Sequence, residues 1–466
     1  MKLLKQIVNV TVVAFLLALS SGAIADDRAP NIVYILLDDA GYGDLSCYGQ
    51  KKFKTPNIDD LASRGMRFTQ HYAGSTVCAP TRSVLMTGLH TGHTFVRGNR
   101  EVKPEGQTAL PADTVTLSKL LQKAGYVTGA FGKWGLGAPG SEGEPTRQGF
   151  DKFYGYNCQR QAHTYYPTHL WDNTTKDELD GKTYAHDLIM DEALNFVRSN
   201  KDKPFFCFLP ITIPHAAMQV PDRYADPFRK KFSQFEDKIG RYAKTETKNP
   251  IASFAGMMTK MDEDVGRVVS LLKELQLDKD TIVFISSDNG PHREGGHNPK
   301  FFDSNGPFRG FKRDLYEGGI RVPLIATWPD KIKPGQESGL ACAHWDMLPT
   351  FCELAKTSAP EKLDGISFLP TLLGKEQQKK HDHLYWEFHE QGGKQAVLFE
   401  DWKVISLNLN KAESKKRIEV FNLAKDPAEK NNVADANPEI VTRAKKLFTD
   451  SHVPSKFWKF GNKKPQ

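Results

Sequence analysis

The chain is poor in cysteine and has no strong excess of either charge. None of the six cysteines in its 466 residues lies in a C-x-x-C pair, so neither a disulfide scaffold nor a structural zinc site is indicated. Cys342 and Cys352 could pair, and the sequence leaves this open. The formal net charge of +7 is mild and the charges are interspersed, which gives no footprint for nucleic-acid binding.

The first 25 residues have the features of an export signal. Lys2 and Lys5 form a basic start, Ile7–Leu19 is apolar, and Ala23-Ile24-Ala25 is a small-residue cleavage site. The apolar run is short for a bilayer span, and a polar chain follows it at once. We therefore expect export to the periplasm or the medium, with a mature chain of net charge +5 that begins at Asp26 and has no membrane anchor.

Two predicted strands end in acidic side chains. Asn31–Leu37 and Thr281–Ser287 are largely apolar runs of strand length, a pattern typical of a parallel sheet buried on both faces. Such sheets bind ligands beyond the carboxyl ends of their strands, where carboxylate and amide oxygens suit a hard cation. Taken alone, the first acidic pair could equally be a helix cap and a solvated Asp. The four candidate ligands are Asp38, Asp39, Asp288 and Asn289.

The stretch Cys78–Gly88 is predicted to be a short helix with a reactive start. Pro80 suits a first helical turn, and Gly88 suits the position after the last one. Cys78 then faces unpaired N–H groups at the positive end of the helix, which favours anionic chemistry beside it. Arg82, about one turn along, offers a bidentate fork for an oxyanion. A buried cysteine before an ordinary helix is the alternative.

Two motifs together resemble those of a known enzyme family. The string C-x-P-x-R at Cys78, followed by four residues and Thr-Gly, resembles the signature of type I sulfatases at every position. Gly132-Lys133-Trp134-Gly135-Leu136-Gly137 is similar to their second signature, G-K-W-H-L-G, but Gly135 stands where the family has His. His215 and Lys312 lie in further matching blocks, and the resemblance runs from about Asn31 to Asn432. On their own, Lys133 and His215 would be a solvated loop lysine and a structural histidine.

The resemblance implies a fold and a division of the chain. We expect an alkaline-phosphatase-like α/β fold, in which helices sandwich a mixed, mostly parallel sheet. A small C-terminal α+β domain follows, since four strand-like segments and one final helix occur after a Lys-rich linker. The expected division is a signal peptide at residues 1–25, a catalytic domain at 26–375 and a small domain at 376–466.

The resemblance also implies the chemistry of the site. In this family a maturation enzyme converts the cysteine to formylglycine, whose hydrate is the nucleophile, and a calcium ion lies beside it. Here the ion would bind Asp38, Asp39, Asp288, Asn289 and an oxygen of modified Cys78. Arg82, Lys133 and Lys312 would neutralise charge on the sulfuryl oxygens, and His215 would protonate the leaving oxygen. The substrate would be a sulfated carbohydrate or an aryl sulfate.

The departure at Gly135 bears on the substrate. Replacing the family's His with Gly removes a donor, and we expect it to leave volume beside the sulfate pocket. His163, in a loop rich in aromatic residues, and His297, in the loop before Lys312, are the candidates for polar contacts there. Aromatic side chains suit the apolar face of a pyranose, although both histidines could merely brace their loops. A 4-O-sulfated galactose or N-acetylgalactosamine is the expected sugar.

Two other functions remain open from the sequence. Related metal sites serve phosphate and phosphonate ester hydrolases of the same superfamily, and activity on matched aryl sulfate and aryl phosphate would separate these from a sulfatase. A catalytically silent glycan-binding protein is the second alternative. The complete set of candidate catalytic and metal-binding side chains argues against that alternative.

Overall fold

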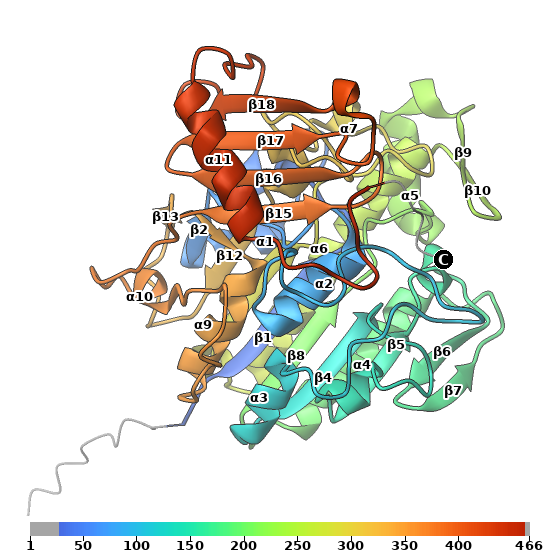
Figure 1. Cartoon of the computed structure of the whole chain (residues 1–466). Helices are drawn as coiled ribbons and strands as arrows, with labels where there is room; N and C mark the ends of the chain where they lie inside the picture. The colour runs from blue at the N-terminus through green and yellow to red at the C-terminus, as the bar shows by residue number, and fades with distance from the viewer. Residues whose placement is uncertain (1–27, 462–466) are drawn as a thin grey trace, which may run out of the picture.

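A ten-stranded mixed sheet forms the centre of the computed structural model, which describes residues 28–461 (Figure 1). The strands run in the order β13-β2-β12-β11-β1-β8-β4-β5-β6-β7, and β11, β1, β8, β4 and β5 are mutually parallel. Their bounds are β1 Asn31–Leu37, β2 Met66–Phe68, β4 Val127–Lys133, β5 Lys152–Tyr156, β6 His169–Asp172, β7 Thr175–Glu178, β8 Phe205–Pro210, β11 Thr281–Ser287, β12 Leu324–Thr327 and β13 Gln336–Ser338. The expected export signal lies outside the described residues.

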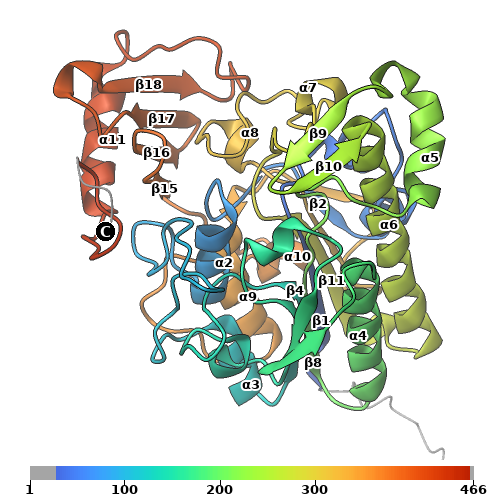
Figure 2. The same ribbon diagram turned by 90° about the vertical axis from the view of Figure 1, so that its right-hand side faces the viewer.

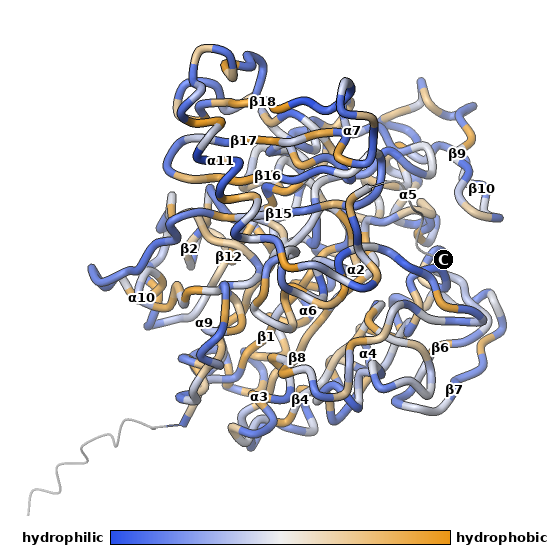
Figure 3. The backbone as a smooth tube through the Cα atoms, in the orientation of Figure 1, coloured by the Kyte–Doolittle hydropathy of each residue, from blue (hydrophilic) through white to orange (hydrophobic). Residues whose placement is uncertain are grey.

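Helices cover both faces of this sheet. In β1, Val33 and Ile35 pack into one hydrophobic core, and Ile32 and Tyr34 pack into the other, so both faces of the strand are buried. The tube through β1 and β8 is accordingly mostly hydrophobic in Figure 3. The first core contains α1 Pro56–Arg64, α4 Ala185–Ser199 and α6 Pro250–Glu274, and the second contains α2 Cys78–Thr87, α3 Leu117–Lys123, α9 Met347–Leu354 and α10 Leu369–Leu372.

Smaller elements lie around the carboxyl ends of the parallel strands. Helix α5 (Asp222–Lys231) packs on α6, and the two-stranded hairpin of β9 (Ile239–Tyr242) and β10 (Thr245–Lys248) follows it (Figure 2). The short strand β3 (His71–Tyr72), which comes just before α2 in the chain, pairs with β14 (Cys342–Ala343). Helices α7 and α8 span Pro299–Phe302 and Glu317–Ile320.

The C-terminal part is a four-stranded antiparallel sheet with one helix across it (Figures 1 and 2). One face packs on the helix, and the other shares a hydrophobic core with Tyr72, Val84 and Trp345 of the larger part. The indole nitrogen of Trp386 also donates to the Ala73 carbonyl at 2.9 Å, close to Cys78 in the chain. The elements are β15 Leu384–Phe388, β16 Lys394–Phe399, β17 Trp402–Leu407, β18 Arg417–Asn422 and α11 Pro438–Asp450.

This architecture confirms the predicted fold class. The sheet is mixed and mostly parallel, helices lie on both of its faces, and a small antiparallel sheet with a final helix follows. All six cysteines are free, so Cys342 and Cys352 are not paired. Among residues 28–461, no helix is long and apolar enough to cross a membrane.

Candidate active site

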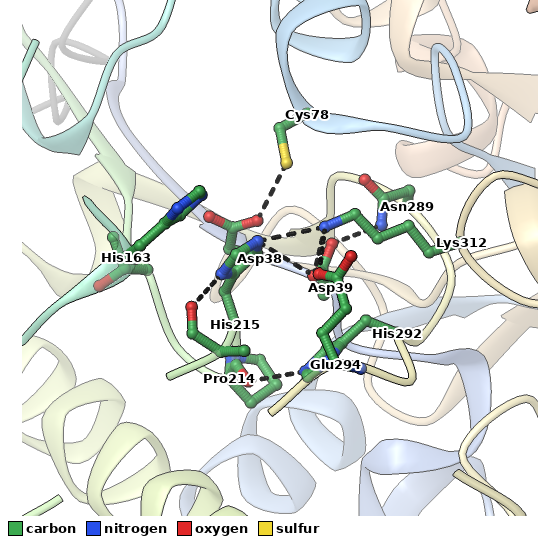
Figure 4. Close-up of polar contacts among 12 residues, drawn as sticks. Asp38, Asp39, Cys78, His163, Pro214, His215, Asn289, His292, Glu294 and Lys312 are labelled. Carbon is green, nitrogen blue, oxygen red and sulfur yellow. Dashed lines mark hydrogen bonds and ion pairs between the residues drawn. The ribbon is translucent and has the colours of Figure 1, made fainter. Parts of the chain in front are cut away.

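Four parallel strands deliver polar side chains beyond their carboxyl ends, as expected for open α/β folds. Figure 4 shows Asp38, Asp39 and Lys312 among the side chains that meet there. Asp38 and Asp39 follow β1, and Asp288 and Asn289 follow β11. Lys133 is the last residue of β4, His215 follows β8 by five residues, and Cys78 is the first residue of α2. Lys312 comes from the loop before α8. The structure therefore brings together all the predicted catalytic and metal-binding residues.

Cys78 lies between the carboxylate of Asp38 and the ammonium group of Lys133. Its Sγ is 3.4 Å from Oδ1 of Asp38 and 3.4 Å from Nζ of Lys133, and all three side chains are buried. Lys133 Nζ also donates to Oδ2 of Asp38 at 2.6 Å. Burial, and then the charge of Asp38, raise the pKa of the Cys78 thiol well above its usual value. The unmodified thiol therefore stays protonated and is a poor nucleophile here.

Arg82 connects the two acidic strand ends. Its Nη2 lies 3.2 Å from Oδ2 of Asp288 and 3.7 Å from Oδ2 of Asp38, and Nη1 donates to the Lys133 carbonyl. The guanidinium is 1% exposed, and its Nε has no partner within residues 28–461. A buried donor left free in this position is available to an anionic ligand.

Lys312 and His215 form the second half of the cluster. Lys312 Nζ donates to Oδ2 of Asp39 at 2.7 Å and lies 3.1 Å from Nε2 of His215. His215 Nδ1 contacts the Ala216 carbonyl, which requires the proton on Nδ1 and leaves Nε2 as the acceptor for Lys312. Burial, and then Lys312, hold the pKa of His215 well below its usual value, so the imidazole is neutral.

The acidic residues fit a hard cation. Burial, and then repulsion from Asp38, raise the pKa of Asp288 to about 7, although Arg82 opposes this shift. Asn289 Nδ2 donates to Oδ1 of Asp39 at 2.7 Å, which leaves the buried Asn289 Oδ1 without a partner in the described part of the chain. Three carboxylates and a free amide oxygen are the donors that Ca²⁺ prefers.

His163 and Tyr242 form a wall beside His215. The rings of His163 and His215 are 5.3 Å apart and nearly parallel, with an interplanar angle of 8°. Tyr242 packs edge-on against both rings, and its hydroxyl lies 3.4 Å from Nε2 of His163. Burial, and then Lys133, lower the pKa of His163 to about 4. No sequence motif pointed to Tyr242, which lies on a short polar hairpin.

His297 is not brought into contact with the catalytic cluster. Its ring is 3.9 Å from that of Phe254 and 4.9 Å from that of His292, and neither ring nitrogen has a partner among the described residues. His292, from the same loop, lies next to the cluster instead. Its ring centre is 5.9 Å from that of His215, and its Nε2 contacts the Pro214 carbonyl at 3.2 Å. The substrate role of His297 therefore stays a prediction.

The loop after β11 also supplies an acidic residue that the sequence reasoning missed. Glu294 lies 3.6 Å from Nζ of Lys312 and 2.7 Å from Arg313. Although burial opposes its ionisation, Lys312 and Arg313 lower the pKa of Glu294 to about 2. Its position a few residues after Asp288, a predicted ligand, was the available signal.

The expected space beside Gly135 is not there. A side-chain carbon at position 135 would begin 2.6 Å from Nε2 of Gln159, so the amide of Gln159 already fills the volume that a longer side chain would need. The prediction of free volume was wrong because a residue on the neighbouring segment after β5 occupies it.

Comparisons with known proteins agree with this geometry. A family model described as Sulfatase matches residues 30–357, and one described as N-sulphoglucosamine sulphohydrolase, C-terminal, matches residues 306–451. Arylsulfatase A of Homo sapiens is 31% identical over 493 residues, covering 93% of this chain and 90% of that protein. An N-acetylgalactosamine-6-O-sulfatase of Bacteroides thetaiotaomicron is 28% identical over 508 residues, covering 91% and 93%.

A solved structure extends the likeness to three dimensions. The crystal structure of Ps i-CgsB in complex with k-i-k-neocarrahexaose superposes with a TM-score of 0.77 at 29% identity, covering 91% of this chain and 93% of that one. Fold, site and family models together define a hydrolase of the sulfatase class. The chain belongs to the sulfatase family and is a sulfatase.

Proposed function

We propose that the protein is an exported, calcium-dependent sulfatase that removes sulfate from carbohydrates with a formylglycine made from Cys78. The observation that carries this is the position of Cys78 Sγ, 3.4 Å from both Asp38 and Lys133 at the focus of the cluster. Burial and Asp38 disfavour the thiolate, and the C-x-P-x-R string at Cys78 is that of sulfatases in which this cysteine becomes formylglycine. A maturation enzyme is therefore a necessary partner.

The chain's own side chains then divide the work of hydrolysis. One hydroxyl of the aldehyde hydrate attacks the sulfur, and the sulfur–oxygen bond to the sugar breaks. Arg82, Lys133 and Lys312 offset the charge on the transferring sulfuryl oxygens. The leaving oxygen takes its proton from the pair of His215 and Lys312, whose nitrogens are 3.1 Å apart.

The modification explains how the enzyme is regenerated. Loss of a proton from the second hydroxyl of the hydrate expels sulfate and restores the aldehyde, a route that a plain Ser or Cys ester lacks. Asp38, Asp39, Asp288 and Asn289 would hold a calcium ion, which polarises the sulfate and favours the ionised nucleophile.

The wall beside His215 supports a carbohydrate substrate. His163 and Tyr242 offer an aromatic face and an imidazole donor next to the leaving-group side of the cluster. One relative is named N-acetylgalactosamine-6-O-sulfatase, another is named arylsulfatase A, and one solved neighbour holds a neocarrahexaose. We favour a 4-O-sulfated galactose or N-acetylgalactosamine as the substrate, with the 6-O-sulfated isomers as the comparison.

Matched aryl esters test the reaction class. The wild-type protein, produced with a maturation enzyme, should hydrolyse an aryl sulfate far faster than the corresponding aryl phosphate, and Cys78→Ala should abolish both activities. Greater activity on the phosphate would favour a phosphate or phosphonate ester hydrolase. Sugar binding without any hydrolysis would favour a silent glycan-binding protein.

Removing the metal tests whether the enzyme depends on calcium. Chelation should abolish sulfatase activity and lower the melting temperature, because the folded protein loses a bound ligand that holds three buried carboxylates together. Calcium should restore both properties. Restoration by zinc but not by calcium would contradict the hard-cation assignment.

Export and the division of the chain complete the proposal. We propose that residues 1–25 are removed on export to the periplasm or the medium, that residues 26–375 form the catalytic part, and that residues 376–466 form the small part. Sequencing the N-terminus of the secreted protein checks the first point, since a start at Asp26 is expected.

A further inference from the structure

Gln159 occupies the place of a side chain that position 135 lacks. Gly135 has a φ of +82°, which favours glycine, and any Cβ there would lie 2.6 Å from Nε2 of Gln159. The position follows Lys133, whose Nζ contacts both Cys78 and Asp38, by only two residues. The Gln159 amide therefore lies beside the segment that carries an active-site cation.

The amides in this segment are buried without partners. Gln159 is 6% exposed and its Nε2 has no hydrogen-bond partner in residues 28–461. Asn157 is fully buried, and neither atom of its amide has a partner there. A buried donor or acceptor without a hydrogen bond is costly, so such groups are rare unless ordered water or a ligand completes them.

Backbone hydrogen bonds hold the amides in register with Lys133. Lys133 is paired with Tyr156 in the ladder between β4 and β5, and the Trp134 N–H donates to the Tyr156 carbonyl at 2.9 Å. The Gly135 N–H donates to the Asn157 carbonyl at 3.1 Å. These bonds tie the backbone at Tyr156 and Asn157 to the segment that carries Lys133, and Gln159 follows two residues later.

We propose that Gln159, supported by Asn157, replaces the missing side chain at position 135 and donates a hydrogen bond to an oxygen of the bound sulfate ester. The inference rests on the proposed sulfatase function and adds a specificity-determining residue to it. An amide is a neutral donor at every physiological pH, unlike an imidazole, so this contact does not titrate. The ligand class is a tetrahedral oxyanion esterified to a sugar.

Two substitutions test the donor. Gln159→Leu removes the amide, and Gln159→Glu keeps its size but places a carboxylate against the sulfate. Each should lower kcat/KM for an aryl sulfate about tenfold to a hundredfold and weaken inhibition by inorganic sulfate. Gln159→Leu should leave the melting temperature unchanged or higher, because it removes a donor that the unliganded protein does not satisfy. A purely structural Gln159 would instead lower it.

The controls separate this inference from the proposed function. Gln122→Leu alters an exposed amide that is bonded to Asp151, and it should keep wild-type kcat/KM and sulfate inhibition. Wild-type kcat/KM in a folded Gln159→Glu protein would overturn the inference while the sulfatase activity stands. Sulfatase activity that survives in the Cys78→Ala variant would instead overturn the proposed function.

Discussion

Asp44 is a buried carboxyl group outside the catalytic cluster. Its Oδ2 accepts a hydrogen bond from the Gly41 N–H at 2.7 Å, and its Oδ1 has no partner among residues 28–461. Burial raises the pKa of Asp44 to about 7, although the nearby Ser304 and the hydrogen bond from the Gly41 N–H oppose the shift. The folded state therefore binds this proton more tightly than the unfolded state, whose carboxyl has a pKa near 3.8.

That shift predicts how stability changes with pH. The contribution of Asp44 is fully present below about pH 4 and is lost as the pH rises through 7, because the folded state must then hold an unpaired charge. Asp44→Asn keeps the acceptor for Gly41, so it should raise the melting temperature more at pH 8 than at pH 5. Asp113→Asn, at an exposed position, is the control. An equal effect of Asp44→Asn at both pH values would contradict the shift.

At the residue scale, the sequence predicted the charged centre of the site and missed its surroundings. Cys78, Arg82 and Lys133 lie in motifs whose spacing is local, so their roles could be proposed without a structure. Gln159 could not be found in this way, because its contact with Gly135 depends on how two neighbouring strands end. His297 was predicted from the sequence but does not contact the catalytic cluster. His292 of the same loop lies between His297 and His215.

The β9–β10 hairpin is the element that places Tyr242 against the active site. Gly240 lets the hairpin approach closely, since a Cβ there would lie 2.0 Å from the Gly295 carbonyl oxygen. Tyr242 then contacts His163 and His215 (Figures 2 and 4 show the hairpin and the two histidines). Because the hairpin touches the leaving-group side, we expect it to affect the sugar more than the sulfate.

Substitution of Tyr242 tests this role. Tyr242→Ala should lower kcat/KM for a sulfated galactoside about tenfold, through loss of a stacking face and of the contact that orients His163, and should change hydrolysis of a small aryl sulfate little. Tyr242→Phe, which keeps the ring, should lie between wild type and Tyr242→Ala. Thr245→Ala, opposite Tyr242 in the hairpin, is the matched control. Equal losses on both substrates would argue against sugar recognition.

At the element scale, buried strands were predictable and polar ones were not. β1, β8 and β11 are covered on both faces, so their sequences are largely unbroken apolar runs that match the structure closely. β7, β9 and β10 are mostly exposed or half-buried, and their short polar sequences resemble those of loops. Tertiary packing decides these segments, which is why the hairpin was absent from the sequence prediction.

Across the whole molecule, a buried ion pair links the C-terminal sheet to the larger part. Lys403 of β17 donates to Glu317 of α8 at 2.8 Å, and both side chains are fully buried. The Tyr72 hydroxyl donates to the other oxygen of Glu317 at 2.9 Å, and Arg321 lies 3.2 Å from it. The contacts of Glu317 and Arg321 are those of a structural network.

Breaking this pair should destabilise the protein strongly. Lys403→Met leaves the Glu317 carboxylate buried without its main partner, and the free energy of unfolding should fall by about 3–5 kcal/mol. Lys446→Met, which breaks an exposed pair with Asp450, should cost less than about 1 kcal/mol. Denaturant unfolding of the three proteins measures both effects. Similar stabilities for the two variants would show that the junction does not depend on this pair.

The mass of the tryptic peptide Phe68–Arg82 tests the central claim most directly. Samples made with increasing amounts of a maturation enzyme should contain increasing fractions of peptide in which the Cys78 thiol has become an aldehyde. Sulfatase activity per molecule should rise in proportion to that fraction and extrapolate to zero without it. Full activity in a sample whose Cys78 is entirely unmodified would contradict the account.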